Sequence, residues 1–208
     1  MRKSQDQSAF WNRVARRYAG MSLRNPSAYE ATLDRVRAHL GQEDRVLELG
    51  CGTGSTAALL APSVGHYIAT DFSTEMIAIA REKQAETENL DFYVVQPGDG
   101  SLPEGPFDAV LAFNVLHLLP DRRGVLEEIL GQLRSGGLFI SKTPCLGGLY
   151  RVLQPVAAAL RFFGKAPKLG FLTQSSLQRE VTDAGFRILE HGDYPARPPS
   201  RFIVASKL

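Results

Sequence analysis

Apolar residues along this 208-residue chain alternate between short runs that are typical of strands and longer stretches with helical spacing. The short runs predict strands over residues 46–49, 66–70, 90–95, 107–113, 138–142, 186–190 and 201–206. Helical spacing and end signals predict helices over about 55–61, 74–86, 121–135 and 173–184. The alternation of the two patterns predicts an α/β fold built on a largely parallel sheet.

The chain departs from this rhythm at two places. Residues 144–172 are rich in proline and glycine around an apolar piece, 149–163, and we expect an insertion with one or two helices there. The last two strands are separated only by a short loop containing Pro195, Pro198 and Pro199. A connection this short predicts a hairpin, so the seventh strand should be antiparallel, unlike the strands of an all-parallel dinucleotide-binding sheet.

Composition limits the classes of protein that are possible. The chain is 44% hydrophobic and 22% charged with a formal net charge of +2, which is ordinary for one globular domain and gives no sign of nucleic-acid binding. Cys51 and Cys145 form no C-x-x-C pair, so neither a disulfide framework nor a metal site is expected, and a reducing cytoplasm fits. The polar N-terminus and the lack of long apolar runs predict neither a signal peptide nor a transmembrane segment.

The most informative segment is Val46–Gly54, where an apolar run leads into three glycines spaced two residues apart, followed by a helix start. Glycines allow a tight turn and a close approach of the backbone to a ligand, and a helix N-terminus favours an anionic group. A dinucleotide fingerprint would need its third glycine at position 55, which is Ser55. The same glycines could also serve only the packing of a strand against a helix.

The run from Glu48 through Gly50, Gly52 and Gly54 resembles the first motif of class I S-adenosylmethionine (SAM)-dependent methyltransferases, E/D-x-G-x-G-x-G. Residues 10–18 are similar to the opening segment of the ubiquinone/menaquinone-methyltransferase-like group. The resemblance implies a doubly wound, Rossmann-like sheet of seven strands in the order 3-2-1-4-5-7-6, with helices on both faces. It also implies a single domain over residues 1–208, in which residues 1–40 form a helical lid.

The resemblance assigns cofactor contacts to the ends of successive strands. Asp71, after the second strand, would bind the ribose hydroxyls, although an aspartate before Ser73 also suits a helix cap. Phe72 and Met76 would flank the adenine, or belong to the core. Asp99 and Gly100 would take the adenine edge, or simply form a turn. The complete set of expected cofactor-binding residues is Tyr18, Glu48, Gly50, Cys51, Gly52, Gly54, Asp71, Phe72, Met76, Asp99, Gly100 and Asn114.

The segment after the fourth strand, Asn114 to Asp121, is similar to a pattern of small-molecule methyltransferases. Asn114 would lie beside the methionine part of the cofactor. His117 is the candidate general base, because an imidazole can accept a proton near neutral pH, although it could equally be a packing residue. Trp11 is a further candidate for contact with the substrate.

The insertion has an unusual charge pattern. No Asp or Glu lies between Glu128 and Glu180, whereas seven Lys and Arg residues do. Three functions are open: a lid over a pocket for an apolar or anionic small molecule, a peripheral contact with an anionic membrane surface, or a helical cap whose basic residues are merely solvated. Tyr150, Phe163 and Phe171 are the expected wall residues of an acceptor site.

Together these patterns predict a cytoplasmic SAM-dependent methyltransferase that acts on a small organic acceptor by in-line displacement. Such a reaction depends mainly on alignment of the reactants. Two alternatives remain open at this point. One is a SAM- or S-adenosylhomocysteine-binding protein without turnover that acts through a partner, and the other is an NAD-dependent oxidoreductase.

Overall fold

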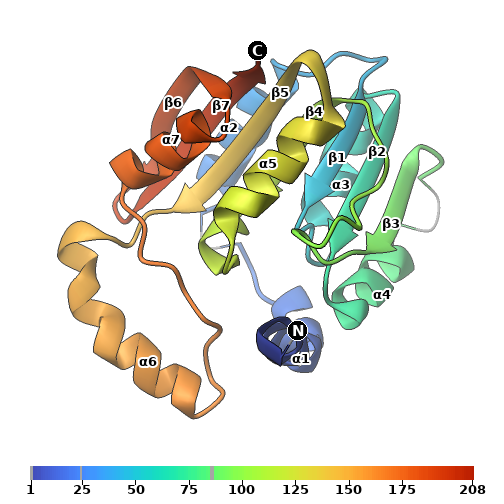
Figure 1. The fold of residues 1–208 in the computed structure, drawn as a ribbon. Helices are drawn as coiled ribbons and strands as arrows, with labels where there is room; N and C mark the ends of the chain where they lie inside the picture. The colour runs from blue at the N-terminus through green and yellow to red at the C-terminus, as the bar shows by residue number, and fades with distance from the viewer. Residues whose placement is uncertain (1, 24, 85–86) are drawn as a thin grey trace.

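Seven strands form one mixed sheet in the computed structural model, which describes residues 2–23, 25–84 and 87–208 (Figure 1). The strand order is β3-β2-β1-β4-β5-β7-β6, and only β7 is antiparallel to its neighbours. The strands are β1 (Arg45–Leu49), β2 (His66–Asp71), β3 (Leu90–Val94), β4 (Phe107–Phe113), β5 (Leu133–Pro144), β6 (Phe186–Ala196) and β7 (Pro199–Lys207). Both the predicted order and the predicted antiparallel seventh strand are confirmed.

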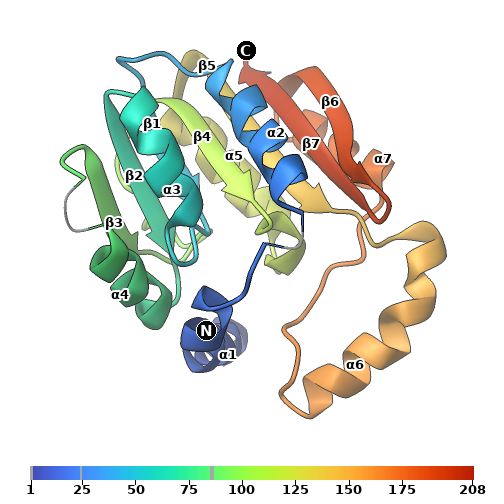
Figure 2. The same cartoon turned by 180° about the vertical axis from the view of Figure 1, so that it is seen from behind.

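Helices cover both faces of the sheet (Figures 1 and 2). One face packs against α2 (Pro26–Arg37), α3 (Ser55–Leu60) and α4 (Thr74–Lys83) through a buried apolar cluster. The opposite face packs against α5 (Arg122–Gln132) and α7 (Gln174–Asp183) through a second cluster. Short 3-10 turns lie at η1 (Ala61–Ser63), η2 (Leu116–Leu118) and η3 (Gly148–Leu153). The strands carry apolar side chains on both faces, as a sheet covered on both sides requires.

Two helices lie outside these layers, near the end of the sheet where the parallel strands finish (Figure 2). The first, α1 (Arg2–Ala19), packs on α4 through Ala15, which is buried beside Met76 and Ile79. The second, α6 (Gln154–Phe162), belongs to the insertion after β5 and extends away from the body of the molecule. The helical character predicted for residues 1–40 and 144–172 is therefore present.

The boundary between α5 and β5 differs from the sequence-based prediction. The helix ends at Gln132, and β5 begins at Leu133 and contains the Gly136-Gly137 pair that was expected to end a helix. Leu133 is buried and pairs with Phe107, and the register shifts before Leu138 pairs with Ala109. Gly136 has φ +73, so the two glycines form an irregularity within the strand.

Smaller differences occur elsewhere. The helix expected over 74–86 ends at Lys83, and residue 86 lies outside the described residues. Strands β6 and β7 are longer than predicted and contain Pro195 and Pro199, which were assigned to the loop. Because β6 is an edge strand and Pro199 is the first residue of β7, neither proline breaks the ladder.

Candidate functional site

The glycine turn between β1 and α3 is held in a conformation that favours glycine. Gly50, Gly52 and Gly54 have φ angles of +69, +56 and +75, in the left-handed region. A Cβ at Gly50 would lie 2.6 Å from Val115 Cγ2, and one at Gly54 would lie 2.9 Å from Phe92 Cε1. A Cβ at Gly52 would meet only Tyr18, at 3.8 Å. The outer glycines are therefore needed for packing, whereas Gly52 has room for a Cβ beside Tyr18.

Asp71, at the end of β2, is hydrogen-bonded directly to this turn. Its Oδ2 accepts a hydrogen bond from the backbone N–H of Gly52 at 3.0 Å, and its Oδ1 accepts one from Ser73 N at 2.9 Å. Burial raises the pKa of the Asp71 carboxyl, while these N–H donors act in the opposite direction. Ser73 supplies the cap of α4 through its own hydroxyl, which accepts a hydrogen bond from Met76 N. Asp71 is therefore not the cap of α4, and its carboxylate is left for the role in ribose binding that the resemblance implies.

Glu48 lies on β1 beneath the turn and is almost completely buried. Its Oε2 accepts a hydrogen bond from the Tyr67 hydroxyl at 2.9 Å. Burial raises the pKa of Glu48 to about 7, against the opposing effect of the Tyr67 hydrogen bond and with a smaller contribution from the Asp71 charge. The site therefore holds two buried carboxyl groups. Cys51, between them, is a buried free thiol whose pKa is raised by burial.

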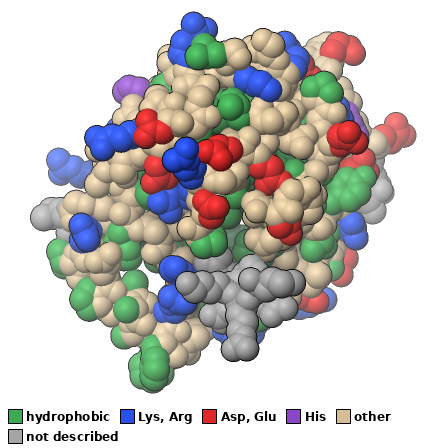
Figure 3. All heavy atoms as spheres, in the orientation of Figure 1, with side chains coloured by type: hydrophobic (Ala, Val, Ile, Leu, Met, Phe, Trp, Pro, Cys, Tyr) green, Lys and Arg blue, Asp and Glu red, His purple; other side chains and the backbone are tan. Residues whose placement is uncertain are grey.

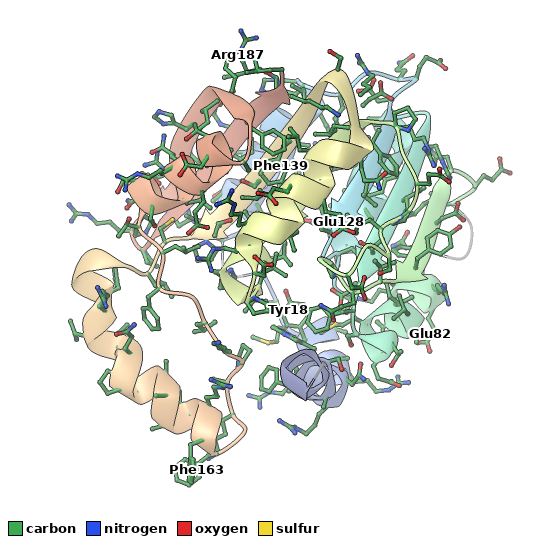
Figure 4. All side chains as sticks on the ribbon, in the orientation of Figure 1. Tyr18, Glu82, Glu128, Phe139, Phe163 and Arg187 are labelled. Carbon is green, nitrogen blue, oxygen red and sulfur yellow. The ribbon has the colours of Figure 1, made fainter. Side chains whose placement is uncertain are left out.

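Helix α1 brings Tyr18 to the glycine turn, because a Cβ at Gly52 would lie 3.8 Å from Tyr18 Cε1. Figure 4 shows Tyr18 between α1 and the lower end of the sheet. Burial of its hydroxyl and the charge of Asp71 raise the pKa of Tyr18. Asn12 also lies on α1. Its Oδ1 accepts a hydrogen bond from Ser73 Oγ at 2.6 Å, and this bond fixes α1 to the turn after β2. No pattern in the sequence pointed to Asn12, because an asparagine inside a helix has no distinctive spacing.

The remaining predicted residues near α4 differ in how deeply they are buried. Phe72 follows Asp71 and is partly exposed. Met76 is buried in the cluster that joins α1 to α4, which favours the core role that the sequence left open. Trp11 packs on the same cluster, and its buried indole N–H has no hydrogen-bond partner among the described residues.

Asp99 and Gly100 lie in the exposed turn after β3. Asp99 Oδ1 accepts a hydrogen bond from Ser101 N at 3.0 Å, which is the arrangement of a turn-forming aspartate. A Cβ at Gly100 would meet nothing within 4 Å. This turn is open to a ligand. Among the described residues, Asp99 forms no hydrogen bond with the glycine turn.

Asn114 directly follows β4 and has φ 55, the one non-glycine residue in the described part of the chain with a positive φ. Its backbone N–H donates to Lys142 O at 2.8 Å, and its side chain is exposed. Such a conformation costs about 1 kcal/mol or more and is common at functional sites. The next residue, Val115, is the side chain that packs against Gly50, so the ends of β1 and β4 meet here.

His117 lies in η2, partly buried, and its Nδ1 has no hydrogen-bond partner among the described residues. Burial lowers the pKa of His117 to about 4, so the imidazole is neutral at physiological pH. Its backbone carbonyl accepts a hydrogen bond from Gly170 N at 2.6 Å, which connects η2 to the insertion. A neutral imidazole can accept a proton, but one with so low a pKa is a weak base.

The three aromatic residues proposed for the acceptor wall are not brought together. Phe171 lines a hollow of about 260 Å³ between α6 and residues 167–171. Tyr150 is partly buried in η3 and does not line it, and Phe163 is exposed at the end of α6. None of the predicted cofactor residues lines this hollow.

Helix α2 adds residues that sequence reasoning missed. Tyr29 Oη lies 2.9 Å from Thr56 Oγ1 at the start of α3, and the pKa of Tyr29 is raised by burial, with a smaller contribution from Glu48. Lys142 on β5 donates from Nζ to Thr32 Oγ1 at 2.7 Å, and burial lowers its pKa. Polar residues inside an amphipathic helix look like ordinary surface positions, so the sequence offered no signal for this group.

The residues present fit SAM. Two buried carboxyl groups and the Tyr18 ring suit a ligand that carries hydroxyl groups and positive charge, and the space at Gly52 and Gly100 is not filled by the protein. The first turn of α3 offers backbone N–H groups to a carboxylate. No group of three or more metal-ligating side chains occurs in the described residues.

The chain is similar to known methyltransferases in sequence. A methyltransferase-domain family matches residues 47–139. Demethylmenaquinone methyltransferase of Clavibacter sepedonicus is 31% identical over 121 residues, covering 58% of this chain and 49% of the relative. A tRNA 5-carboxymethoxyuridine methyltransferase of Escherichia coli is 37% identical over 111 residues, covering 51% and 42%. A ubiquinone biosynthesis O-methyltransferase of Xylella fastidiosa is 34% identical over 100 residues, covering 47% and 41%. The chain thus spans less than half the length of these relatives.

Solved structures share the fold over nearly the whole chain. Magnesium protoporphyrin IX methyltransferase from Synechocystis, determined with bound S-adenosylhomocysteine, aligns with a TM-score of 0.69 at 20% identity, covering 99% of this chain and 97% of its own. The cyclase SpnF aligns with a TM-score of 0.73 at 18% identity, covering 90% and 84%. Residues 47–139 therefore match a methyltransferase-domain family, and nearly the whole chain shares the predicted fold with solved methyltransferases.

Proposed function

We propose that the protein transfers a methyl group from SAM to a small organic acceptor. The observation that carries this proposal is the hydrogen bond between Asp71 and Gly52, which joins the end of β2 to the glycine turn under Tyr18. SAM supplies an electrophilic methyl group on a positively charged sulfur. The chain's own contribution would be to bind the cofactor and orient it.

In this proposal each residue has a limited role. Asp71 accepts hydrogen bonds from the ribose, Glu48 and Tyr67 form the buried floor, and the glycine turn receives the carboxylate of the methionine part. Tyr18 and Asn12 hold α1 over the site, which helps to exclude water. Phe72 and Gly100 border the adenine, and Asn114 borders the methionine amine.

The acceptor would bind on the side of the insertion. The hollow beside α6 is lined by apolar residues together with Gln154, Arg161 and Lys168, which suits an apolar molecule with an anionic group. His117 is connected to this segment through Gly170. Because His117 has a low pKa, we propose that it positions the acceptor rather than removing a proton near neutral pH.

We also propose that the acceptor is a small molecule and that the protein has no nucleic-acid partner. One relative bears on this choice, because it is a tRNA methyltransferase. A net charge of +2 supports a small acceptor over a polyanion. The cytoplasm is the proposed compartment, supported by two free, buried cysteines. No helix in the described residues is long and apolar enough to span a membrane.

The experiment is methyl transfer from radiolabelled SAM to fractionated cell extract, separated into small molecules, lipids, proteins and RNA. Label in a small-molecule or lipid fraction is the expected result. Label in RNA would overturn the choice of acceptor. SAM binding without label in any fraction would favour the non-catalytic alternative, and NAD binding without SAM binding would favour the oxidoreductase.

A further inference from the structure

The insertion exposes an unusual amount of apolar surface. Val152 is 70% exposed, Phe162 86% and Phe163 70%, and no residue of α6 is buried. Hydrophobic side chains gather on this part of the molecule in the space-filling view, at the lower left of Figure 3. The label of Phe163 in Figure 4 lies at the outer tip of the insertion, away from the sheet.

The two faces of α6 have different surroundings. Gln154, Ala157, Ala158 and Arg161 recur at helical spacing and face the hollow formed with residues 167–171. Val156 and Leu160, with Phe163 just beyond the helix, recur at the same spacing on the other face and are 56%, 42% and 70% exposed. The inner face is thus occupied by the insertion itself, whereas the outer face is apolar and uncovered by any described residue.

The charged residues of the insertion itself all have one sign. No Asp or Glu occurs between Glu128 and Glu180, and Arg151, Lys165 and Lys168 are exposed beside the apolar residues. An apolar helical face bordered only by cations is complementary to a layer of anionic headgroups above hydrocarbon. A soluble protein partner would have no need for so uniform a charge.

We propose that the outer face of the insertion, residues 148–168, docks on an anionic membrane surface. Val152, Val156, Leu160 and Phe163 enter the headgroup boundary, while Arg151 and Lys165 contact lipid phosphates. Arg13 of α1 donates a hydrogen bond to Gly164 O at 2.7 Å, so the docked segment is joined to the helix that lies over the cofactor site. This docking goes beyond the proposed methyl transfer and does not depend on it.

Vesicle flotation at about 0.1 M salt tests the proposal, with vesicles of phosphatidylcholine alone and of phosphatidylcholine with phosphatidylserine. The protein should float with the phosphatidylserine vesicles and be released by high salt. Val152→Ser/Phe163→Ser should weaken binding about tenfold or more. The matched control, Leu189→Ser/Leu208→Ser, changes two apolar residues that are also exposed and should bind as the wild type does.

A second pair of variants tests the charges. Arg151→Gln/Lys165→Gln should weaken binding about tenfold or more, whereas Arg179→Gln/Arg187→Gln, which removes two exposed cations outside the segment, should not. Failure to float with anionic vesicles, equal binding to neutral vesicles, or wild-type binding by either insertion variant would overturn the proposal. Concentration-dependent self-association abolished by Val152→Ser/Phe163→Ser would overturn it in favour of a second copy. That variant should still bind SAM in calorimetry as the wild type does, so a failure here is distinct from a failure of the proposed function.

Discussion

The carboxylate of Asp71 accepts a hydrogen bond from the backbone N–H of Gly52 at 3.0 Å. These residues end one strand and form the turn after its neighbour, so the bond joins two adjacent strand ends into one site. Asp71 also accepts a hydrogen bond from Ser73 N, and this pair of N–H donors holds the carboxylate in a fixed position. A buried acid held in this way can bind hydroxyl groups without reorganising.

The three glycines should respond differently to substitution by alanine. Gly50→Ala and Gly54→Ala force a Cβ against Val115 or Phe92, in addition to the positive φ, and should destabilise the fold by several kcal/mol. A Cβ at Gly52 causes no clash, so Gly52→Ala should lower the free energy of unfolding by only about 1–2 kcal/mol, because of the positive φ angle. The same variant should nevertheless abolish SAM binding. Thermal unfolding and calorimetry on the same samples check this. Equal losses of stability in all three variants would contradict the assignment of roles.

Glu48 should make stability depend on pH in an unusual direction. Its pKa rises from an ordinary 4.5 to about 7 on folding, so between these values the folded chain binds a proton that the unfolded chain releases. Its contribution to stability is therefore complete below about pH 4.5 and falls as the pH rises towards 7, by up to about 3 kcal/mol. Glu48→Gln should remove this slope in denaturant unfolding measured across pH 5–8. An unchanged slope would show that Glu48 titrates normally.

His117 should contribute to acid sensitivity, not to the pH profile of catalysis near neutrality. Because its pKa is lowered from 6.5 to about 4 on folding, the unfolded chain takes up a proton first, and stability falls as the pH drops through this window. His117→Gln should reduce that loss. The ratio of wild-type to His117→Gln activity should also stay constant between pH 6 and 8. An inflection near 6.5 in that ratio would identify His117 as a general base.

Met76 should matter through the docking of α1. Truncation to alanine leaves a cavity beneath Ala15 and should cost about 2–5 kcal/mol of stability. Hydrogen exchange in residues 8–19 should become faster, while Leu177→Ala, a buried residue on the opposite face of the sheet, should destabilise the fold without selectively exposing α1. Equal exchange in α1 for both variants would mean that Met76 does not hold this helix.

The sheet was largely predictable because its strands are buried and its helices have clear caps. The glycine turn, Ser73 and Thr173 each mark a helix start with a physical signal that the structure reproduces. The end of α5 was not predictable in the same way. The apolar residue Leu133 and the flexible pair Gly136-Gly137 fit either a helix end or a strand with a bulge, and pairing with Phe107 decides between them.

The site residues likewise include some that the sequence predicts and some that it does not. Asp71 and the glycine turn follow one another at strand ends, so their proximity follows from the parallel sheet. The contacts of Asn12 and Lys142 depend on where α1 and α2 pack, which no local pattern encodes. Met76 shows the converse, since its helical spacing fits an adenine wall and a core position equally well, and only the presence of α1 above it places it in the core.

Isothermal calorimetry of SAM with the wild type, Asp71→Ala and Asp183→Ala tests the central claim most directly. We expect the wild type and Asp183→Ala, which lacks an exposed acid on α7, to bind alike, and Asp71→Ala to bind at least about tenfold more weakly while remaining folded by circular dichroism. Undiminished SAM binding by a folded Asp71→Ala, or binding of NAD in place of SAM by the wild type, would contradict the account.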